Sequence, residues 1–179
     1  TELGNYALFI NGQLFREAGL DPEADAPETW EDILELAPKL TKKDASGNIT
    51  QRAFDFAYPI PDEILGGGII FQGMAHQLGG QYFSDDRTEG RVNTDPWVKT
   101  YTFVRDYARE FGGMSLTPSS IGFYEGNVAM LLSGPWYLPQ LIQAYNPDLV
   151  DDIVTAPFPR WREGVVNDGG SALYAYGLF

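Results

Sequence analysis

The alternation of short apolar runs with helical segments is the feature that most constrains the fold of this chain. Strand-like runs occupy residues 6–10, 53–58, 128–132, 153–159 and 172–179, with helical patterns between them. The clearest helical pattern is "APETWEDILELAPKL", in which Thr29 is placed to cap the helix and Asp32 stands three residues later, as in a capping box. Strands that alternate with helices are typical of the α/β class. We therefore expect a small, mostly parallel or mixed sheet flanked by helices.

Three helical segments give more specific expectations. The helix after Thr29 is expected to kink or end at Pro38, and "DEILGGGIIFQGMAHQLGG" predicts a helix in two pieces hinged at residues 66–68. Pro96 at a first helical position opens the longest helix, which Gly112 and Gly113 close. The apolar faces are expected to comprise Trp30, Ile33, Leu34 and Ala37 in the first helix, and Trp97, Tyr101, Val104, Ala108 and Phe111 in the longest.

Composition narrows the possible partners. The 179 residues are enough for one domain with a real core, and 25 acidic against 12 basic residues give a net charge of −13. A polyanion such as nucleic acid, or an anionic bilayer, would be repelled. The absence of cysteine excludes thiolate nucleophiles, disulfides and Cys-based zinc sites. Both ends run into structured-looking segments, so we expect a piece of a longer chain.

Catalytic arrangements find little support in the sequence. His76, the one histidine, lies among apolar residues of a helical segment, so a structural role is favoured over general-base catalysis. The acidic pairs at residues 85–86 and 151–152 fit solvated loops better than a glycosidase pair, and the first of them lacks the spacing of a calcium loop. The glycines at 66–68 lack the Lys and Ser/Thr of a phosphate loop. We expect no cofactor and no metal.

Two turns combine flexible backbone with residues suited to a flat ligand. In "SGPWYLP" a strand stops at Gly134 and Pro135, so Trp136 falls where ligands collect in open α/β sheets, outside the carboxyl ends of strands. In "NDGGSALY", Gly169 and Gly170 permit close backbone approach and Ser171 adds a hydroxyl. An indole with small polar donors suits a sugar, which has an apolar face and a rim of hydroxyls. From these residues alone, Trp136 is equally consistent with a cap on the core.

The ordered motifs "ALFINGQLFREAGL", "PETWEDILELAPKL", "QLGGQYF", "FYEGNVAMLLSGPW", "TAPFP" and "GGSALYAYG" closely resemble the extracellular solute-binding proteins, family 1, of bacterial ABC importers. The resemblance implies a periplasmic-binding-protein type II-like lobe covering residues 1–179. By the same resemblance, we expect this lobe to be the second of two that close on a ligand, with residues 1–11 and 170–179 crossing to the other lobe. The resemblance also implies a non-enzymatic, monomeric, extracytoplasmic receptor that binds a carbohydrate and delivers it to the membrane permease.

The same resemblance assigns roles to single residues. It implies that Trp136 stacks on a sugar ring, with Tyr137 on the same wall. It implies that Gly169 and Gly170 border the cleft, next to the Ser171 hydroxyl, and that Phe71 falls near a place where relatives have a cleft aromatic. The first lobe's own contacts would lie outside this sequence. Other solutes remain open as ligands, namely a glycerol-phosphate ester, a polyamine or a peptide, and a glycoside hydrolase is the least favoured alternative.

Overall fold

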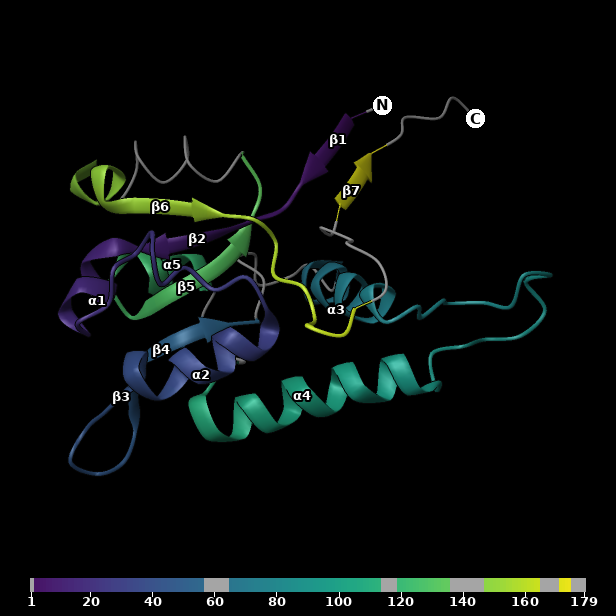
Figure 1. The fold of residues 1–179 in the computed structure, drawn as a ribbon, viewed down its shortest axis with the longest axis horizontal. Coiled ribbons are helices and arrows are strands. Elements are labelled where there is room, and N and C mark those ends of the chain that lie inside the picture. Colours follow the sequence, from purple (N-terminus) through teal and green to yellow (C-terminus); the bar gives the residue numbers. More distant parts are fainter. Residues whose placement is uncertain (1, 57–64, 114–118, 136–146, 165–170, 175–179) are drawn as a thin grey trace.

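The computed structural model of the chain describes residues 2–56, 65–113, 119–135, 147–164 and 171–174. Within these ranges the fold is a mixed α/β arrangement of one five-stranded sheet, a separate two-stranded ribbon and flanking helices (Figure 1). None of the described helices is long and apolar enough to cross a bilayer. The predicted α/β class, with a small mixed sheet, is confirmed.

The five-stranded sheet has the order β3-β4-β5-β2-β6. Its strands are β2 (Ala7–Asn11), β3 (Lys42–Lys43), β4 (Ile49–Asp55), β5 (Val128–Ser133) and β6 (Ile153–Ala156). Among the described strand pairs of this sheet, β4–β5 is parallel and the others are antiparallel. Because β2 runs against its neighbours, β4, β5 and β6 all point the same way and end at one edge of the sheet (Figure 1).

Helices cover both faces of this sheet. The helices are α1 (Gly12–Glu17), α2 (Trp30–Leu40), α3 (Leu65–Gln77), α4 (Asp95–Phe111) and α5 (Ser119–Tyr124), with a 3-10 turn η1 at Pro147–Asp152. Side chains alternate between the faces, as the two-residue period of a strand requires. Leu8 and Met130 join the larger core with α2, α3 and α4, whereas Phe9 and Leu131 join a smaller core with Phe123 of α5.

A ribbon of two antiparallel strands stands apart from the main sheet. Strand β1 (Glu2–Asn5) pairs with β7 (Ser171–Tyr174), in the register Glu2 to Tyr174 and Asn5 to Ser171. Tyr6 alone separates β1 from β2, so the ribbon leaves the sheet at the edge where β4, β5 and β6 end (Figure 1). The crossing of residues 1–11 and 170–179 to a second lobe stays a prediction.

Helix α2 begins as predicted and ends later than predicted. The Thr29 hydroxyl accepts a hydrogen bond from the Asp32 backbone N–H at 3.0 Å, and the Asp32 carboxylate accepts one from the Thr29 N–H at 2.9 Å, so the capping box is confirmed. Pro38 lies inside the helix, which continues to the fully buried Leu40. Burial of this last turn outweighs the hydrogen bond that proline cannot donate. Leu34 is 39% exposed and is not part of the buried face.

Two further helix predictions were wrong in detail. Helix α3 runs without a break through residues 66–68, so the predicted hinge is absent there, because the burial of Ile70, Met74 and Ala75 compensates for the helix-weakening glycines. Residues 62–64, the start of the predicted first piece, lie outside the described residues. In α4 the buried set is Trp97, Thr100, Val104, Tyr107 and Phe111. Tyr101 is 48% exposed, and Ala108 is half-buried, so neither belongs to the fully buried face. Both spacings satisfy the helical period, and only the neighbouring elements select one.

Candidate functional site

The edge where β4, β5 and β6 end is the place where this fold can collect a ligand. The strands end at Asp55, Ser133 and Ala156, and the register places Leu131 beside Asp55 and Ala7 beside Ser133. We call this the carboxyl edge. In open α/β sheets the chain leaves the strands at this edge through loops, and those loops form the ligand crevice. The ends of β4, β5 and β6 and the β1–β7 ribbon therefore lie at the same edge.

Buried polar groups mark the carboxyl edge. Asp55 is only 1% exposed, and its Oδ2 lies 2.9 Å from Nε of Arg52. Ser133 is fully buried, and its Oγ has no hydrogen-bond partner among the described residues. Neither residue is among those predicted from the sequence. For Ser133 the signal was a polar residue at the end of an apolar strand, whereas Asp55 lay inside the predicted strand 53–58 and had no such signal.

The predicted cleft aromatic Phe71 lies close to this edge. It is half-buried on α3, and its ring centroid is 6.3 Å from that of Phe56, the residue directly after β4. On its other side, it is 5.7 Å from the ring of Tyr101 on α4. Phe71 therefore belongs to an aromatic cluster between the end of β4 and the α3–α4 pair. Whether it touches a ligand stays a prediction.

The remaining predicted residues are only partly covered by the structure. Trp136, Tyr137, Gly169 and Gly170 lie outside the described residues. Ser171 is described through its backbone, which pairs with Asn5 at the base of the ribbon. Strand β5 does run to Ser133 and is followed by buried Gly134 and exposed Pro135, so the chain is led to the carboxyl edge just before Trp136.

Residues 159–164 form a segment that we call the strap. It follows β6 and precedes residues 165–170, and it contains no helix or strand beyond a bridge between Arg160 and Thr29. Two backbone hydrogen bonds form this bridge. The Trp30 N–H donates to the Arg160 carbonyl at 3.0 Å, and the Arg160 N–H donates to the Glu28 carbonyl at 3.1 Å. The strap thus lies along the start of α2.

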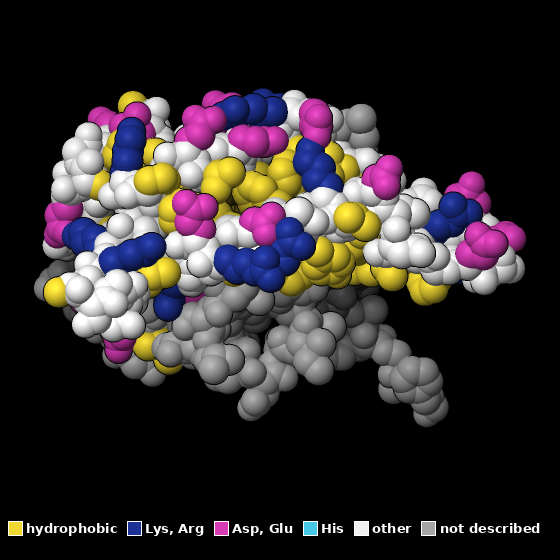
Figure 2. Space-filling model, turned by 90° about the horizontal axis from the view of Figure 1, so that it is seen from below, with side chains coloured by type: hydrophobic (Ala, Val, Ile, Leu, Met, Phe, Trp, Pro, Cys, Tyr) yellow, Lys and Arg dark blue, Asp and Glu magenta, His cyan; other side chains and the backbone are white. Residues whose placement is uncertain are grey.

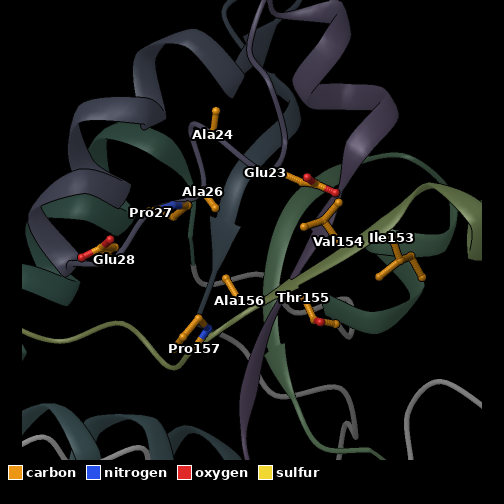
Figure 3. Close-up of a pocket in the computed structure, with 10 residues that line it drawn as sticks. All are labelled: Glu23, Ala24, Ala26, Pro27, Glu28, Ile153, Val154, Thr155, Ala156 and Pro157. Atoms are coloured by element: carbon orange, nitrogen blue, oxygen red, sulfur yellow. The ribbon is translucent and has the colours of Figure 1, made fainter.

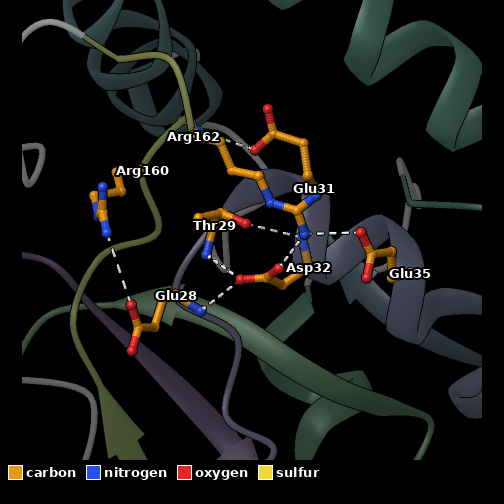
Figure 4. Close-up of polar contacts among 7 residues, drawn as sticks. All are labelled: Glu28, Thr29, Glu31, Asp32, Glu35, Arg160 and Arg162. Atoms are coloured by element: carbon orange, nitrogen blue, oxygen red, sulfur yellow. Dashed lines mark hydrogen bonds and ion pairs between the residues drawn. The ribbon is translucent and has the colours of Figure 1, made fainter.

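The basic side chains of the strap are engaged by carboxylates. The Arg162 guanidinium donates to Asp32 at 2.5 Å and to Glu35 at 2.7 Å, while Arg160 lies 3.8 Å from Glu28 (Figure 4). These hydrogen bonds raise the pKa of Arg162 above its ordinary value. Arg162 is therefore engaged by two carboxylates, whereas Arg160 makes only a long ion pair at the exposed surface.

A surface hollow of about 540 Å³ lies beside β6 (Figure 3). Its lining comes from residues 23, 24 and 26–28 on one side and from residues 153–157 on the other. Glu23 and Glu28 give it an acidic rim, and its described lining includes neither a basic residue nor a predicted site residue. Across the described residues, no group of three or more His, Asp or Glu side chains is arranged to hold a metal ion.

The other predictions about single groups agree with these positions. His76 lies half-buried on α3 with its ring 6.1 Å from that of Tyr82, which fits a structural role. Asp86 is exposed and accepts hydrogen bonds from Ser84 and Thr88, as expected of a solvated loop. On the face in Figure 2, Lys and Arg side chains are interspersed with Asp and Glu, so that the described part of that face carries no basic patch.

The family model for bacterial extracellular solute-binding proteins matches residues 1–179. The chain belongs to this family. A curated relative from Sinorhizobium fredii, named as a probable amino-acid ABC transporter periplasmic-binding protein, is 30% identical over 103 residues. That alignment covers 57% of this chain and 21% of the relative. The chain thus spans only part of a full-length solute-binding protein.

Solved structures of such proteins share the fold. A solute-binding protein from Thermotoga lettingae, bound with α-D-tagatose, superposes with a TM-score of 0.72 at 20% identity, over 94% of this chain and 41% of that one. A cyclic α-maltosyl-1,6-maltose binding protein from Arthrobacter globiformis gives 0.70 at 23% identity, over 90% and 38%. UgpB from Mycobacterium tuberculosis, in complex with glycerophosphocholine, gives 0.66 at 18% identity, over 90% and 37%.

Proposed function

We propose that this chain is the second lobe of the substrate-binding component of an ABC importer and that it binds a sugar or oligosaccharide in an inter-lobe cleft. The observation that carries the proposal is the convergence of β4, β5, β6 and the β1–β7 ribbon at the carboxyl edge. Strand β5 leads there into Trp136, whose indole is suited to the apolar face of a sugar ring.

The other ligand contacts of the proposal follow the same edge. Tyr137 extends the wall of Trp136, and Phe71 supplies an aromatic from α3. Gly169 and Gly170 let the backbone approach the ligand, and Ser171 offers a hydroxyl to its rim. The likeness to proteins whose structures hold α-D-tagatose or whose names include a maltosyl sugar supports a carbohydrate ligand.

The proposal includes the setting of the protein. A receptor of this kind is non-enzymatic and monomeric, works outside the cytoplasm and hands its ligand to the membrane subunits of the permease. Membership of the extracellular solute-binding family supports the location and the partner. No cofactor enters this function, and a net charge of −13 disfavours nucleic acid as a partner.

A non-sugar solute is the second candidate, favoured by the likeness to a glycerophosphocholine complex and by the amino-acid name of the relative. An anionic phosphate needs a free cation or a helix N-terminus. Arg162 of the strap is held by two carboxylates, which makes it less available to a phosphate and favours the neutral sugar. A glycoside hydrolase is disfavoured, since neither "SGPWYLP" nor "NDGGSALY" contains a pair of carboxylates.

The test is titration calorimetry of the full two-lobe protein with a panel of mono- and oligosaccharides, glycerophosphocholine and amino acids. We expect heat with a sugar, and Trp136→Ala should weaken its binding by about 1–3 kcal/mol, the loss expected when a well-packed contact aromatic is truncated. Trp136→Phe is the matched control, because it keeps a ring that can stack. Unchanged affinity in Trp136→Ala would remove this residue from the site, and no heat with any sugar would refute the carbohydrate ligand.

A further inference from the structure

The side-chain amide of Gln77 joins three separate parts of the chain. Gln77 is the last residue of α3 and is fully buried. Its Oε1 accepts hydrogen bonds from Nε1 of Trp30 at 3.0 Å and from the backbone N–H of Trp161 at 3.2 Å. Its Nε2 donates to the carbonyl of Pro159 at 2.8 Å. One amide therefore links α2, α3 and the strap.

The strap depends on such contacts because, among the described residues, its strand pairing is limited to the bridge between Arg160 and Thr29. Trp161 is 2% exposed, and its Nε1 donates to the carbonyl of Met74 on α3 at 2.9 Å. Its ring lies 5.0 Å from that of Phe103 on α4, and the ammonium of Lys99 lies 4.6 Å above it. Lys99 also pairs with Glu163. The strap is thus packed against α2, α3 and α4 together. Its backbone is fixed by one hydrogen bond that Gln77 donates to Pro159 and one that Gln77 accepts from Trp161.

Of the parts joined by this clamp, α3 carries a predicted ligand residue, and the strap precedes the chain segment that contains others. Helix α3 carries Phe71, less than two turns before Gln77. The strap is followed, after residues 165–170, by Ser171 at the start of β7. A binding site works when its contacts are held within a fraction of an ångström by groups behind them. A buried amide with both its oxygen and its nitrogen engaged fixes relative position more tightly than apolar packing does, because its hydrogen bonds are directional.

We propose that Gln77 is a positioning residue that holds the strap against α3 and thereby fixes α3, with its predicted ligand residue Phe71, relative to the strap and α2. This role rests on the proposed function for its effect on affinity. Its effect on the strap does not depend on the ligand. Gln77 itself touches no ligand in this role and acts through Pro159 and Trp161.

The experiment uses the full two-lobe protein and two Gln77 variants. Gln77→Leu keeps the volume and leaves three buried groups without their partner. Gln77→Glu keeps the acceptor oxygens and, when ionised, has no donor for the Pro159 carbonyl. It serves if Gln77→Leu does not fold. The control is Phe123→Leu in the smaller core on the opposite face of the sheet, which lowers stability without touching the strap.

Two readouts separate positioning from stability. Hydrogen exchange by mass spectrometry should show faster exchange over residues 159–164 in the Gln77 variants and not in Phe123→Leu. Calorimetry with the sugar that titrates the parent protein should show about tenfold weaker affinity in Gln77→Leu, a loss of the size that small misplacements of binding groups cause. Phe123→Leu should bind as the parent does.

The outcomes are distinct. Unchanged exchange in the strap of both Gln77 variants overturns the clamp. Faster exchange with parental affinity overturns its role in the ligand site. If the parent protein binds no sugar, the proposed function fails instead, and the exchange data alone decide whether Gln77 holds the strap.

Discussion

At the scale of single residues, backbone conformation decides where the longest helix can end. Gly112 closes α4 with φ of 71°, in the left-handed region, where a side chain is disfavoured. A Cβ at this position would also lie 2.7 Å from Cδ1 of Ile49, the first residue of β4. Gly112 therefore ends α4 where an L-residue would be strained and where the Ile49 side chain would have to shift to admit a Cβ.

We predict that Gly112→Ala lowers the free energy of unfolding by about 1–2 kcal/mol, the cost of the left-handed conformation in an L-residue. Urea unfolding followed by circular dichroism measures it. Gly90→Ala is the control, because a Cβ at residue 90 would meet no described atom within 4 Å and the φ of Gly90 is not in the left-handed region. Equal stability of the two variants would contradict a conformational cost at Gly112.

Some of these residue-scale features could be predicted from the sequence, and others could not. The capping box of Thr29 and Asp32 and the closure at Gly112 are local patterns, so the order of residues alone predicts them. Gln77 has no such signal, because its partners Pro159 and Trp161 lie 82 and 84 residues away. The predicted ligand residues rest on the family resemblance and on the end of β5, since stacking on a sugar leaves no local pattern in the sequence.

At the scale of elements, the start of α2 combines a cap with an ion-pair cluster. Burial raises the pKa of the Asp32 carboxyl, but hydrogen bonds from Arg162 and from the side chain and backbone of Thr29 outweigh it and lower the pKa below its ordinary value. The unfolded chain therefore binds more protons than the folded one in the acid range. The resulting stability is present above the unfolded pKa of about 4 and is lost as the pH falls through the folded pKa.

We predict that Asp32→Asn lowers stability at pH 7 and flattens its decline between about pH 5 and pH 2. Arg162→Met should act in the same direction with a smaller effect, because it leaves the Thr29 cap intact. Urea unfolding at a series of pH values is the measurement, with Glu110→Gln on the exposed face of α4 as a charge-matched control. A decline in Asp32→Asn as steep as in the parent would exclude this carboxylate as a source of acid sensitivity.

The phases of the helices show why sequence alone stops short of the packed structure. In α4, an apolar face through residues 97, 101 and 104 and one through residues 97, 100 and 104 both fit the helical period. In the structure, Thr100 and Tyr107 are on the buried face. Residues 66–68 look like a hinge in isolation, yet the packing of Ile70 and Met74 carries α3 through them. Contacts with neighbouring elements decided both cases, and the local sequence pattern does not reveal those contacts.

At the scale of the whole molecule, excess negative charge opposes the compact state. A net charge of −13 on 179 residues causes like-charge repulsion, which is stronger in the compact folded state than in the expanded unfolded chain. Several surface ion pairs, including Arg16 with Asp152 and Lys42 with Glu17, offset only part of it, since exposed pairs contribute little each.

We predict that raising the salt concentration from about 10 mM to about 200 mM at pH 7 raises the melting temperature, because the Debye length falls from about 30 Å to less than about 10 Å. Differential scanning calorimetry in NaCl measures the shift, and choline chloride repeats it with an unrelated cation. A fall in melting temperature would mean that the local ion pairs outweigh the net repulsion.

The separate β1–β7 ribbon has a mechanical consequence. Glu2 and Tyr174 face each other at one end of the pair, and Asn5 and Ser171 face each other at the other. Tension that pulls the chain apart beyond Glu2 and Tyr174 loads the ribbon from that end, so its hydrogen bonds break one after another, as in a zipper. The five-stranded sheet shares no described ladder with the ribbon and is shielded from this peeling. The ribbon is therefore a compliant link that yields under tension before the sheet does.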